Sequence, residues 1–321
     1  MLKFFSYISM AVMLLGIASC HKGEIMLHIQ RIDAHTAYDL NDVKFVNDSV
    51  GYICGGPRYA SGIFIRTLDG GRTWSVPDSV MTSTLYTIHF FSAGEGFVGG
   101  FYGHATYTAD SGHTFSDVSF SSIAINQLSF YGRQRGVAAC GWGYKGGPIY
   151  NTTDGGATWQ QAYFDSLHTF IGCAYLDDST VVVCGYGTVV RSTDGGHTYR
   201  VVKENGDFYQ NMQFVNSITG YAVGYQGEII KSTDAGKSWR IVKGGNGLFG
   251  KVDHLMGLDF IDENNGYAVG ESGLMVHTSD GGLNWQTVKP FTGERLRGIH
   301  MFSATSGIVV GGGGSVYLFQ E

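Results

Sequence analysis

A short block that recurs six times along the 321 residues constrains the fold of this chain more than any other feature. Each copy has the form Ser/Thr-x-Asp-x-Gly-x-x-aromatic, as in Thr67 to Trp74. Successive block aspartates lie 41, 44, 40, 40 and 46 residues apart. A repeat of this length is one supersecondary unit that must stack on its neighbours to bury a core. The six aspartates are Asp69, Asp110, Asp154, Asp194, Asp234 and Asp280.

Four strand-like segments accompany each block. An apolar strand comes first, a second one ends in glycine, as in Gly266 to Gly270, and a third, such as Glu228 to Lys231, leads into the block. The aromatic residue of the block then opens a fourth strand, as in Trp239 to Val242. Four short antiparallel strands in about 40 residues are typical of one propeller blade. A content of 14% aromatic residues and 49 glycines suits such strands and their tight turns.

The two ends of the chain complete the count of blades. Residues 296–321 repeat the first three strands of a unit and stop before any block. Residues 25–32 are the one strand-like segment left without a unit. Pairing these two segments would close the ring and remove exposed sheet edges. The sequence therefore predicts an all-β fold over residues 25–321: a seven-bladed β-propeller of four-stranded antiparallel blades, closed by the N-terminal strand.

The composition of the block favours a structural role. The block falls in the hairpin loop between the third and fourth strands, where Gly71 and Gly156 can take the positive φ that other residues avoid. The aspartate can accept hydrogen bonds from turn N–H groups and from the Ser/Thr hydroxyl, while the aromatic ring is buried. Because each aspartate lies in a separate blade, the six cannot share one metal ion. We expect structural aspartates, no metal site and no cofactor.

The first residues have the features of an export signal. Lys3 is basic, Ile8 to Ile17 is apolar, and small residues follow. The apolar stretch is too short to span a bilayer. Ile17 to Cys20 resembles the bacterial lipobox, in which the cysteine is lipidated and becomes the mature N-terminus. The sequence predicts a lipoprotein signal peptide at 1–19, a lipidated tether at 20–24, and a location in the bacterial cell envelope, facing the periplasm or the cell surface.

Export would permit disulfides among the other cysteines, but their positions favour free thiols. Cys54, Cys140 and Cys184 each precede a glycine, at the place that valine takes in other repeats. Cys173 lies one strand before Cys184 and could be its cross-strand neighbour, which leaves one possible bridge. We expect small, buried, reduced cysteines.

The blocks resemble the Asp-box, or bacterial neuraminidase repeat, of sialidases, sortilin-like receptors and xyloglucan-type endoglucanases. Gly220 to Gly224, followed by Gly227 to Trp239, is most similar to the repeat of the photosystem II stability and assembly factor family. That resemblance covers about residues 25–321 and implies a single propeller that acts as an assembly scaffold without catalysis. The arginine-rich patch of that family corresponds only to scattered candidates, such as Arg58, Arg295 and Arg297.

The sequence offers few candidates for catalysis. The early Arg-Ile-Pro motif of sialidases is absent, and one propeller cannot form the cleft that xyloglucan-type enzymes build between two. Asp259 with Glu271 is a carboxylate pair that could act in a glycosidase, although either is more simply a solvated or hydrogen-bonded group. His89 and His300 share one position in the innermost strands of blades two and seven, where hydrogen-bonded core residues are favoured over ligands. We predict no catalytic residue; the alternative is a carbohydrate-active enzyme with acidic residues at the channel mouth.

Aromatic residues gather in the loops that enter the first strand and that link the second strand to the third. Exposed rings on this face of a propeller would serve protein or carbohydrate recognition, above all in the long loops 55–62 and 141–148. A net charge of -6 gives no reason to bind nucleic acid, and the membrane is expected to be contacted through the lipid alone. We predict a monomeric scaffold for a protein or glycan of the cell envelope. Its predicted binding residues are Arg58, Tyr59, Tyr102, Trp142, Tyr144, Lys145, Tyr186, Tyr209, Tyr225 and Arg297.

Overall fold

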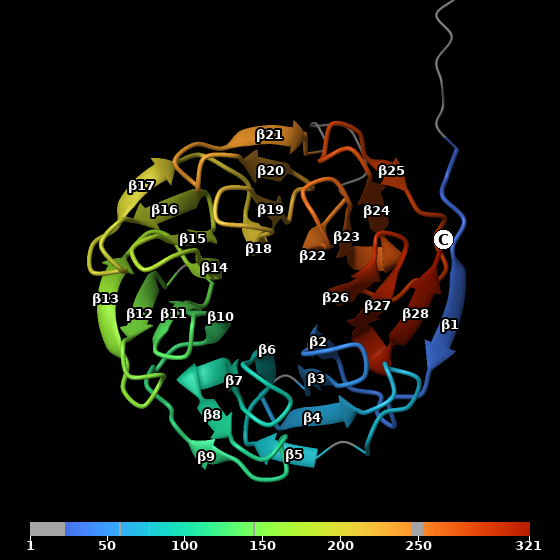
Figure 1. The fold of residues 1–321 in the computed structure, drawn as a ribbon, viewed down its shortest axis with the longest axis horizontal. Helices are drawn as coiled ribbons and strands as arrows, with labels where there is room; N and C mark the ends of the chain where they lie inside the picture. The colour runs from blue at the N-terminus through green and yellow to red at the C-terminus, as the bar shows by residue number, and fades with distance from the viewer. Residues whose placement is uncertain (1–22, 58, 77, 144, 246–252) are drawn as a thin grey trace, which may run out of the picture.

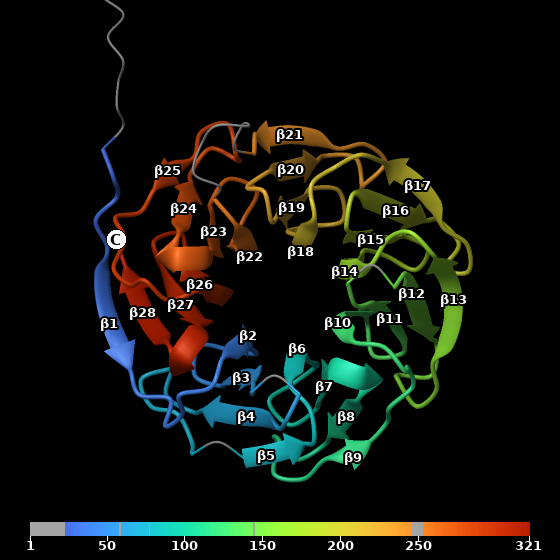
Figure 2. The same ribbon diagram turned by 180° about the vertical axis from the view of Figure 1, so that it is seen from behind.

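The computed structural model of the protein describes residues 23–57, 59–76, 78–143, 145–245 and 253–321. Over these residues the chain forms a ring of seven four-stranded antiparallel sheets around a central channel (Figure 1). Figure 2 shows the same ring from behind. The prediction of a seven-bladed propeller is therefore confirmed. The signal peptide and Cys20 lie outside the described residues, among which no helix is long and apolar enough to cross a membrane.

In blades one to six the chain builds each sheet from the channel outward, because successive strands pair in order. Short 3-10 turns, η1 (Phe101–Gly103) and η2 (Glu271–Gly273), follow the second strands of blades two and six. The strands of these blades are β2 (Leu40–Phe45), β3 (Gly51–Gly55), β4 (Gly62–Thr67) and β5 (Asp78–Met81); β6 (Leu85–Phe90), β7 (Gly96–Gly100), β8 (Ala105–Thr108) and β9 (Ser116–Asp117); β10 (Ile125–Tyr131), β11 (Arg135–Cys140), β12 (Gly147–Thr152) and β13 (Gln160–Asp165); β14 (Phe170–Tyr175), β15 (Val181–Gly185), β16 (Thr188–Ser192) and β17 (Arg200–Lys203); β18 (Tyr209–Phe214), β19 (Gly220–Gly224), β20 (Ile229–Ser232) and β21 (Arg240–Lys243); β22 (Leu255–Phe260), β23 (Gly266–Gly270), β24 (Met275–Thr278) and β25 (Gln286–Thr287).

Blade seven joins the two ends of the described chain. Its inner strands are β26 (Leu296–Ser303), β27 (Ser306–Gly311) and β28 (Val316–Gln320), with η3 (Gly312–Gly314) after β27. The outer strand is β1 (His28–Ile32), which pairs antiparallel with β28 at the rim (Figure 1). The predicted ring closure is confirmed.

The segment before β1 also contacts blade six. The Ile25 N–H donates to the Thr287 carbonyl at 3.0 Å, and the Lys289 N–H donates to the Ile25 carbonyl at 2.9 Å. The N-terminal strand predicted over residues 25–32 is thus divided, because Ile25 forms a parallel bridge with Val288, next to β25, while His28–Ile32 pairs with β28. The N-terminal segment therefore forms main-chain hydrogen bonds with both blade six and blade seven.

Contacts between neighbouring blades form the core. Every residue of β19 is buried, and its Tyr221 stacks on Phe260 of the next blade with 3.8 Å between ring centroids. Glycine opens this strand because a β carbon on Gly220 would lie 2.6 Å from the Phe214 ring. Similar stacks join Tyr52 to Phe90 and Phe97 to Phe130 across other blade boundaries.

Each Asp-box closes the hairpin between the third and fourth strands with one set of hydrogen bonds. In blade one, Asp69 accepts hydrogen bonds from the Thr73 N–H at 2.9 Å and from the hydroxyls of Thr73 and Thr67 at 2.6 and 2.7 Å. Thr67 accepts the N–H of Gly71, whose φ is 83°. In the other five boxes the aspartate likewise accepts from the Ser/Thr two residues earlier and from the N–H four residues later. These bonds hold a turn, as the block composition predicted.

Asp194→Ala is expected to lower the free energy of unfolding by about 1 kcal/mol, because it removes the acceptor of several donors at an exposed turn. Hydrogen bonds from Thr198 lower the pKa of Asp194, and equivalent bonds lower the pKa values of Asp69, Asp110 and Asp154 to about 2. A carboxyl whose pKa falls on folding stabilises the fold above its unfolded pKa of about 4, and this stability is lost as the pH drops toward the folded pKa. Urea titrations across the acid range should show a smaller acid-dependent loss for Asp194→Ala than for the wild type; an equal loss would contradict the turn role.

The four described cysteines, Cys54, Cys140, Cys173 and Cys184, are free and buried, as expected. Cys173 pairs opposite Val183, and Cys184 pairs opposite Gly172. Because successive residues of a strand face opposite sides of the sheet, the two thiols point away from each other. The suggestion that Cys173 and Cys184 are cross-strand neighbours is therefore wrong, because Cys173 lies opposite the residue before Cys184.

Candidate functional site

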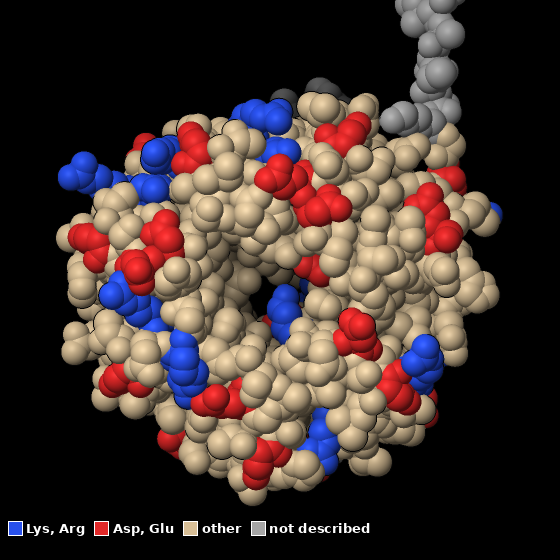
Figure 3. Space-filling view, in the orientation of Figure 1, with Lys and Arg blue, Asp and Glu red and all other residues tan. Residues whose placement is uncertain are grey.

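The two faces of the ring carry different loops. Because the strands of a blade alternate in direction, the turns between second and third strands and the connections between blades reach one face, which we call the loop face. The Asp-boxes reach the opposite face, which we call the Asp-box face. The loop face is toward the reader in Figure 2 and the Asp-box face in Figure 3. On the Asp-box face the channel is open at its centre, and Lys or Arg atoms are visible inside it (Figure 3).

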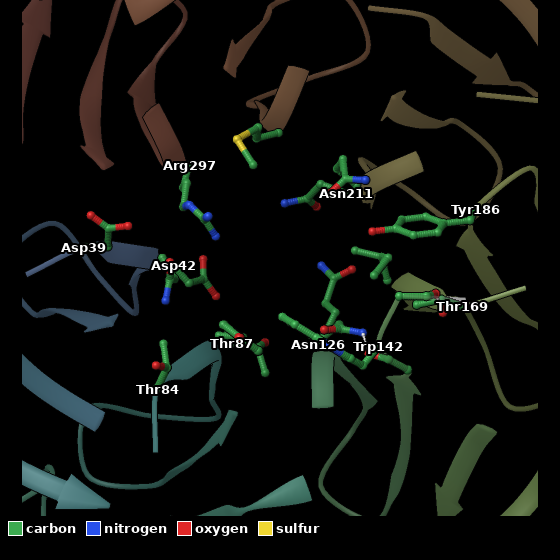
Figure 4. A pocket seen from close by; sticks show the side chains of 18 of the residues that line it. Asp39, Asp42, Thr84, Thr87, Asn126, Trp142, Thr169, Tyr186, Asn211 and Arg297 are labelled. Atoms are coloured by element: carbon green, nitrogen blue, oxygen red, sulfur yellow. Dashed lines mark hydrogen bonds between the residues drawn. The ribbon is translucent and has the colours of Figure 1, made fainter. Parts of the chain in front are cut away.

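A cavity of about 310 Å³ occupies the channel at the loop face (Figure 4). The side chains of Arg297, Asp42, Asn126 and Tyr186 point into it from different blades (Figure 4). An open cavity with many amide and hydroxyl groups suits a ligand that forms several hydrogen bonds. The polar residues of its wall include Asp39, Asn41, Asp42, Lys44, Thr84, Thr87, Asn126, Gln127, Thr169, Gln210, Asn211 and Arg297.

A bulge in every innermost strand supplies the wall of this cavity. In β2 the register moves from Leu40 opposite Gly55 to Asp42 opposite Cys54, which leaves Asn41 as the extra residue. The same shift occurs in the other six innermost strands. A bulge re-aims the side chain of the extra residue, here toward the channel. All seven bulge residues line the cavity: Asn41, Tyr86, Asn126, Ile171, Gln210, Met256 and Arg297.

Charged side chains lie deeper in the channel. A second cavity of about 210 Å³ shares Asp42, Lys44, Thr87 and Gln127 with the first one. Lys44 Nζ lies 3.8 Å from the Asp42 carboxylate. Burial raises the pKa of Asp42, and the Asp42 carboxylate raises the pKa of Lys44. The ammonium group is thus held in its charged form inside the channel.

The channel carboxylates tie neighbouring blades together. Asp42 of blade one accepts the Ile88 N–H of blade two at 3.0 Å. Asp259 of blade six accepts the Met301 N–H of blade seven at 2.7 Å and a hydrogen bond from the Gln213 amide of blade five at 2.7 Å. Burial raises the pKa of Asp259 as well. Both carboxylates therefore serve as acceptors for main-chain donors of the next blade.

His89 and His300 are packed against aromatic rings. His89 lies 4.9 Å from the Phe130 ring, and His300 stacks on Phe45 at 5.3 Å. Burial lowers the pKa of each histidine to about 4, so both rings are neutral at neutral pH. Across the part of the chain that the structure describes, no three His, Cys, Asp or Glu side chains are placed to share a metal ion.

Four aromatic residues meet on the loop face beside the cavity, and we call them the aromatic cluster: Tyr59, Phe101, Tyr102 and Trp142. Phe101 lies at the centre, with its ring centroid 4.9 Å from Tyr59, 4.2 Å from Tyr102 and 4.9 Å from Trp142. Tyr59 and Tyr102 are 54% and 57% exposed, whereas Phe101 is buried. Trp142 also lines the cavity, so the cluster and the cavity are continuous.

The structure brings together several of the predicted binding residues. Tyr59, Tyr102 and Trp142 belong to the aromatic cluster, and Trp142, Tyr186 and Arg297 line the cavity. Lys145 is exposed in the loop that carries Trp142. Two further predicted residues, Arg58 and Tyr144, lie outside the described residues.

Two other predicted binding residues are held inside the protein or by neighbours. The prediction for Tyr209 is wrong, because its side chain is fully buried and its hydroxyl donates to Glu228 at 2.6 Å. Tyr209 opens β18 at the position that Leu255 takes in β22, so alignment of the repeats could have identified it as core. Tyr225 stacks on His254 at 4.0 Å and is half-buried.

The carboxylate pair suggested for glycosidase chemistry is separated by the fold. Asp259 lies four residues beyond Leu255 in β22, while Glu271 follows Gly270, which pairs with Leu255. Four residues of a strand span about 13 Å, so the two carboxylates belong to opposite ends of the blade. Sequence reasoning also missed most of the cavity wall, although the second residue of each innermost strand was a repeating signal for it.

The family model described as photosynthesis system II assembly factor YCF48 matches residues 23–209 and 203–301. No curated protein matches the chain. A solved structure of YCF48 bound to D1 peptide has a TM-score of 0.69 and 17% identity, over 92% of this chain and 95% of that chain. The structure of YCF48 from Cyanidioschyzon merolae has a TM-score of 0.69 and 16% identity, over 91% of this chain and 98% of that chain. The WD40 repeats of RRP9 give 0.72 and 10%, over 91% and 97%. At these identities the solved structures show a shared fold alone.

Proposed function

Because the chain belongs to the photosynthesis system II assembly factor YCF48 family, we propose that it is a non-catalytic binding protein that holds a segment of a partner protein on its loop face. A related YCF48 propeller is described as bound to a D1 peptide. The observation that carries the proposal for this chain is the open cavity at the loop-face end of the channel, continuous with the aromatic cluster.

The chemistry of this surface suits an extended peptide. Each peptide residue brings an N–H and a carbonyl that need partners once water is displaced. The amide side chains of Gln210 and Asn211 carry donors and acceptors around the cavity, and Asn126 adds its amide oxygen as an acceptor because its nitrogen already donates to two main-chain carbonyls. The exposed rings of Tyr59 and Tyr102 and the half-buried ring of Trp142 beside it supply apolar contact area at low entropic cost. Polar wall and aromatic cluster together match a chain with a polar backbone and apolar side chains.

The alternative of a carbohydrate-active enzyme has weaker support. Its chemistry needs two carboxylates placed on either side of a glycosidic bond. The channel carboxylates of Asp42 and Asp259 accept main-chain hydrogen bonds from neighbouring blades instead. Their positions are explained by the assembly of the ring.

Site-specific photo-crosslinking tests the proposal. A photoreactive residue in place of Tyr186, which lines the cavity, is expected to crosslink a protein in cells that express the chain. The matched control replaces Leu283, which is 69% exposed in an Asp-box on the opposite face, and is expected to give none of that product. Trp142→Ala should lower the yield from position 186 about tenfold or more. Equal crosslinking from both faces, or release of sugars from envelope glycans by the purified protein, would contradict the proposal.

We also propose that the protein acts at the bacterial cell envelope, anchored through a lipidated Cys20. The support is the apolar signal and lipobox-like sequence alone. Metabolic labelling with a fatty acid should mark the wild type and not Cys20→Ser; label that persists on the variant would disprove the anchor.

A further inference from the structure

We infer that the aromatic cluster is the anchor point for one compact apolar side chain, such as leucine, isoleucine or proline, of the partner peptide. This inference rests on the proposed function and adds the kind of side chain that is recognised. It follows from the backbone of the cluster, the angles between its rings and the charge beside it.

The backbone of the cluster is strained where its exposed rings are attached. Tyr59 and Tyr102 have φ of 65° and 58°, in the left-handed region that bulky residues avoid. Tyr102 is the middle residue of η1, and the middle residues of η2 and η3 are Ser272 and Gly313, with φ of 55° and 62°. The turn thus needs a left-handed residue, for which glycine is the unstrained choice. A tyrosine there has a cost to folding, and strain of this kind is typical of functional sites.

The angles between the rings decide among apolar and sugar ligands. The Tyr59 and Phe101 rings are inclined at 68°, Phe101 and Trp142 at 73°, and Tyr59 and Trp142 at 74°. The Tyr102 ring is tilted at 52° to Phe101, so the cluster presents no flat platform on which a sugar ring would stack. The inclined rings of Tyr59, Tyr102 and Trp142 could each contact a small branched or cyclic side chain from a different side, which favours apolar contact.

The charge next to the cluster disfavours a cationic side chain as its occupant. Lys145 is exposed three residues after Trp142, in the same loop, and its N–H donates to the Trp142 carbonyl. An ammonium or guanidinium group over these rings would gain a cation–π contact but would be repelled by that lysine. An uncharged apolar side chain meets no such opposition.

Selection of displayed random peptides on the purified full-length protein gives the test, with Tyr102→Gly as the critical variant. We expect selected peptides to share one Leu, Ile, Val, Met or Pro position, and to bind Tyr102→Gly about tenfold or more weakly than the wild type. The melting temperature of Tyr102→Gly should not fall, since glycine relieves the strained backbone. The matched control is Ser272→Gly, which makes the same backbone change in η2 and removes no ring, and should bind like the wild type.

The outcomes separate the inference from the proposed function. Peptides that bind Tyr102→Gly as well as the wild type, or whose shared residue is Lys or Arg, would overturn the anchor while leaving peptide binding intact. Selection of no peptide, together with binding of glycans, would overturn both. If Tyr102→Gly melts at a lower temperature, Tyr59→Asn provides the second variant, because asparagine tolerates a positive φ and removes the other exposed tyrosine. Retained peptide affinity in a folded Tyr59→Asn would then refute the inference.

Discussion

Ile29→Asp combined with Ile32→Asp is expected to leave the protein without a cooperative melting transition. Ile32 is 7% exposed and packs in the core that blades seven and one share, and Ile29 packs against the core of blades six and seven. A charge at each position would lose apolar burial and add a desolvation cost, together about 5 kcal/mol or more. That loss is comparable with the whole stability of a typical domain. Displacement of β1 would also leave the edge of β28 unpaired and prone to aggregation.

A matched variant in the same strand separates ring closure from a general effect on the N-terminus. Gln30→Ala with Arg31→Ala changes two exposed side chains of β1 and should shift the melting temperature by only a few degrees at most. Calorimetry and size-exclusion chromatography of both double variants give the comparison. A normal, monomeric melt of the aspartate variant would mean that β1 is dispensable for the ring.

The fold could be predicted from the sequence because each repeat shows the same pattern of strands around an Asp-box. Six blocks at a near-constant spacing identify the hairpin between third and fourth strands, and the incomplete last unit identifies the strand that it lacks. Local chemistry determined these elements, since the Asp69 turn is closed by residues within a few positions of one another. Such short-range bonds can be read along the chain.

The candidate site could be predicted only in part, since it depends on contacts between distant repeats. The sequence marked Tyr59, Tyr102 and Trp142 as aromatic loop residues, but it did not show that the three surround Phe101. The cavity wall comes from one bulge residue in each blade, and a bulge is a property of strand register that composition does not reveal. Tyr209 was misplaced for the same reason, because a shift of a single residue decides between core and loop.

Asp259→Ala is expected to lower the free energy of unfolding by about 2 to 4 kcal/mol. The substitution leaves the Met301 N–H and the Gln213 amide, each bonded to this carboxylate at 2.7 Å, without their acceptor inside the channel. Removal of a buried charge offsets part of that cost, and the offset is smaller than the loss of two buried hydrogen bonds. Denaturant titration should therefore show a lower midpoint for the variant than for the wild type.

A surface carboxylate of the same blade gives the matched control. Asp262 accepts the N–H groups of Asn264 and Asn265 at 2.7 and 2.8 Å in an exposed turn, so Asp262→Ala should lower the free energy of unfolding by about 1 kcal/mol or less.

The pH dependence of stability adds a second criterion. Because burial raises the pKa of Asp259, the folded state holds its proton more tightly than the unfolded state, and wild-type stability falls as the pH rises from about 4 through the raised pKa. The Asp259→Ala variant lacks this carboxyl group. The difference in free energy of unfolding between the wild type and the variant should therefore become smaller as the pH rises. Equal costs at Asp259 and Asp262 would show that the channel carboxylate does not bind the blades together, and a cost of Asp259→Ala that grows with pH would show that folding does not raise the pKa of Asp259.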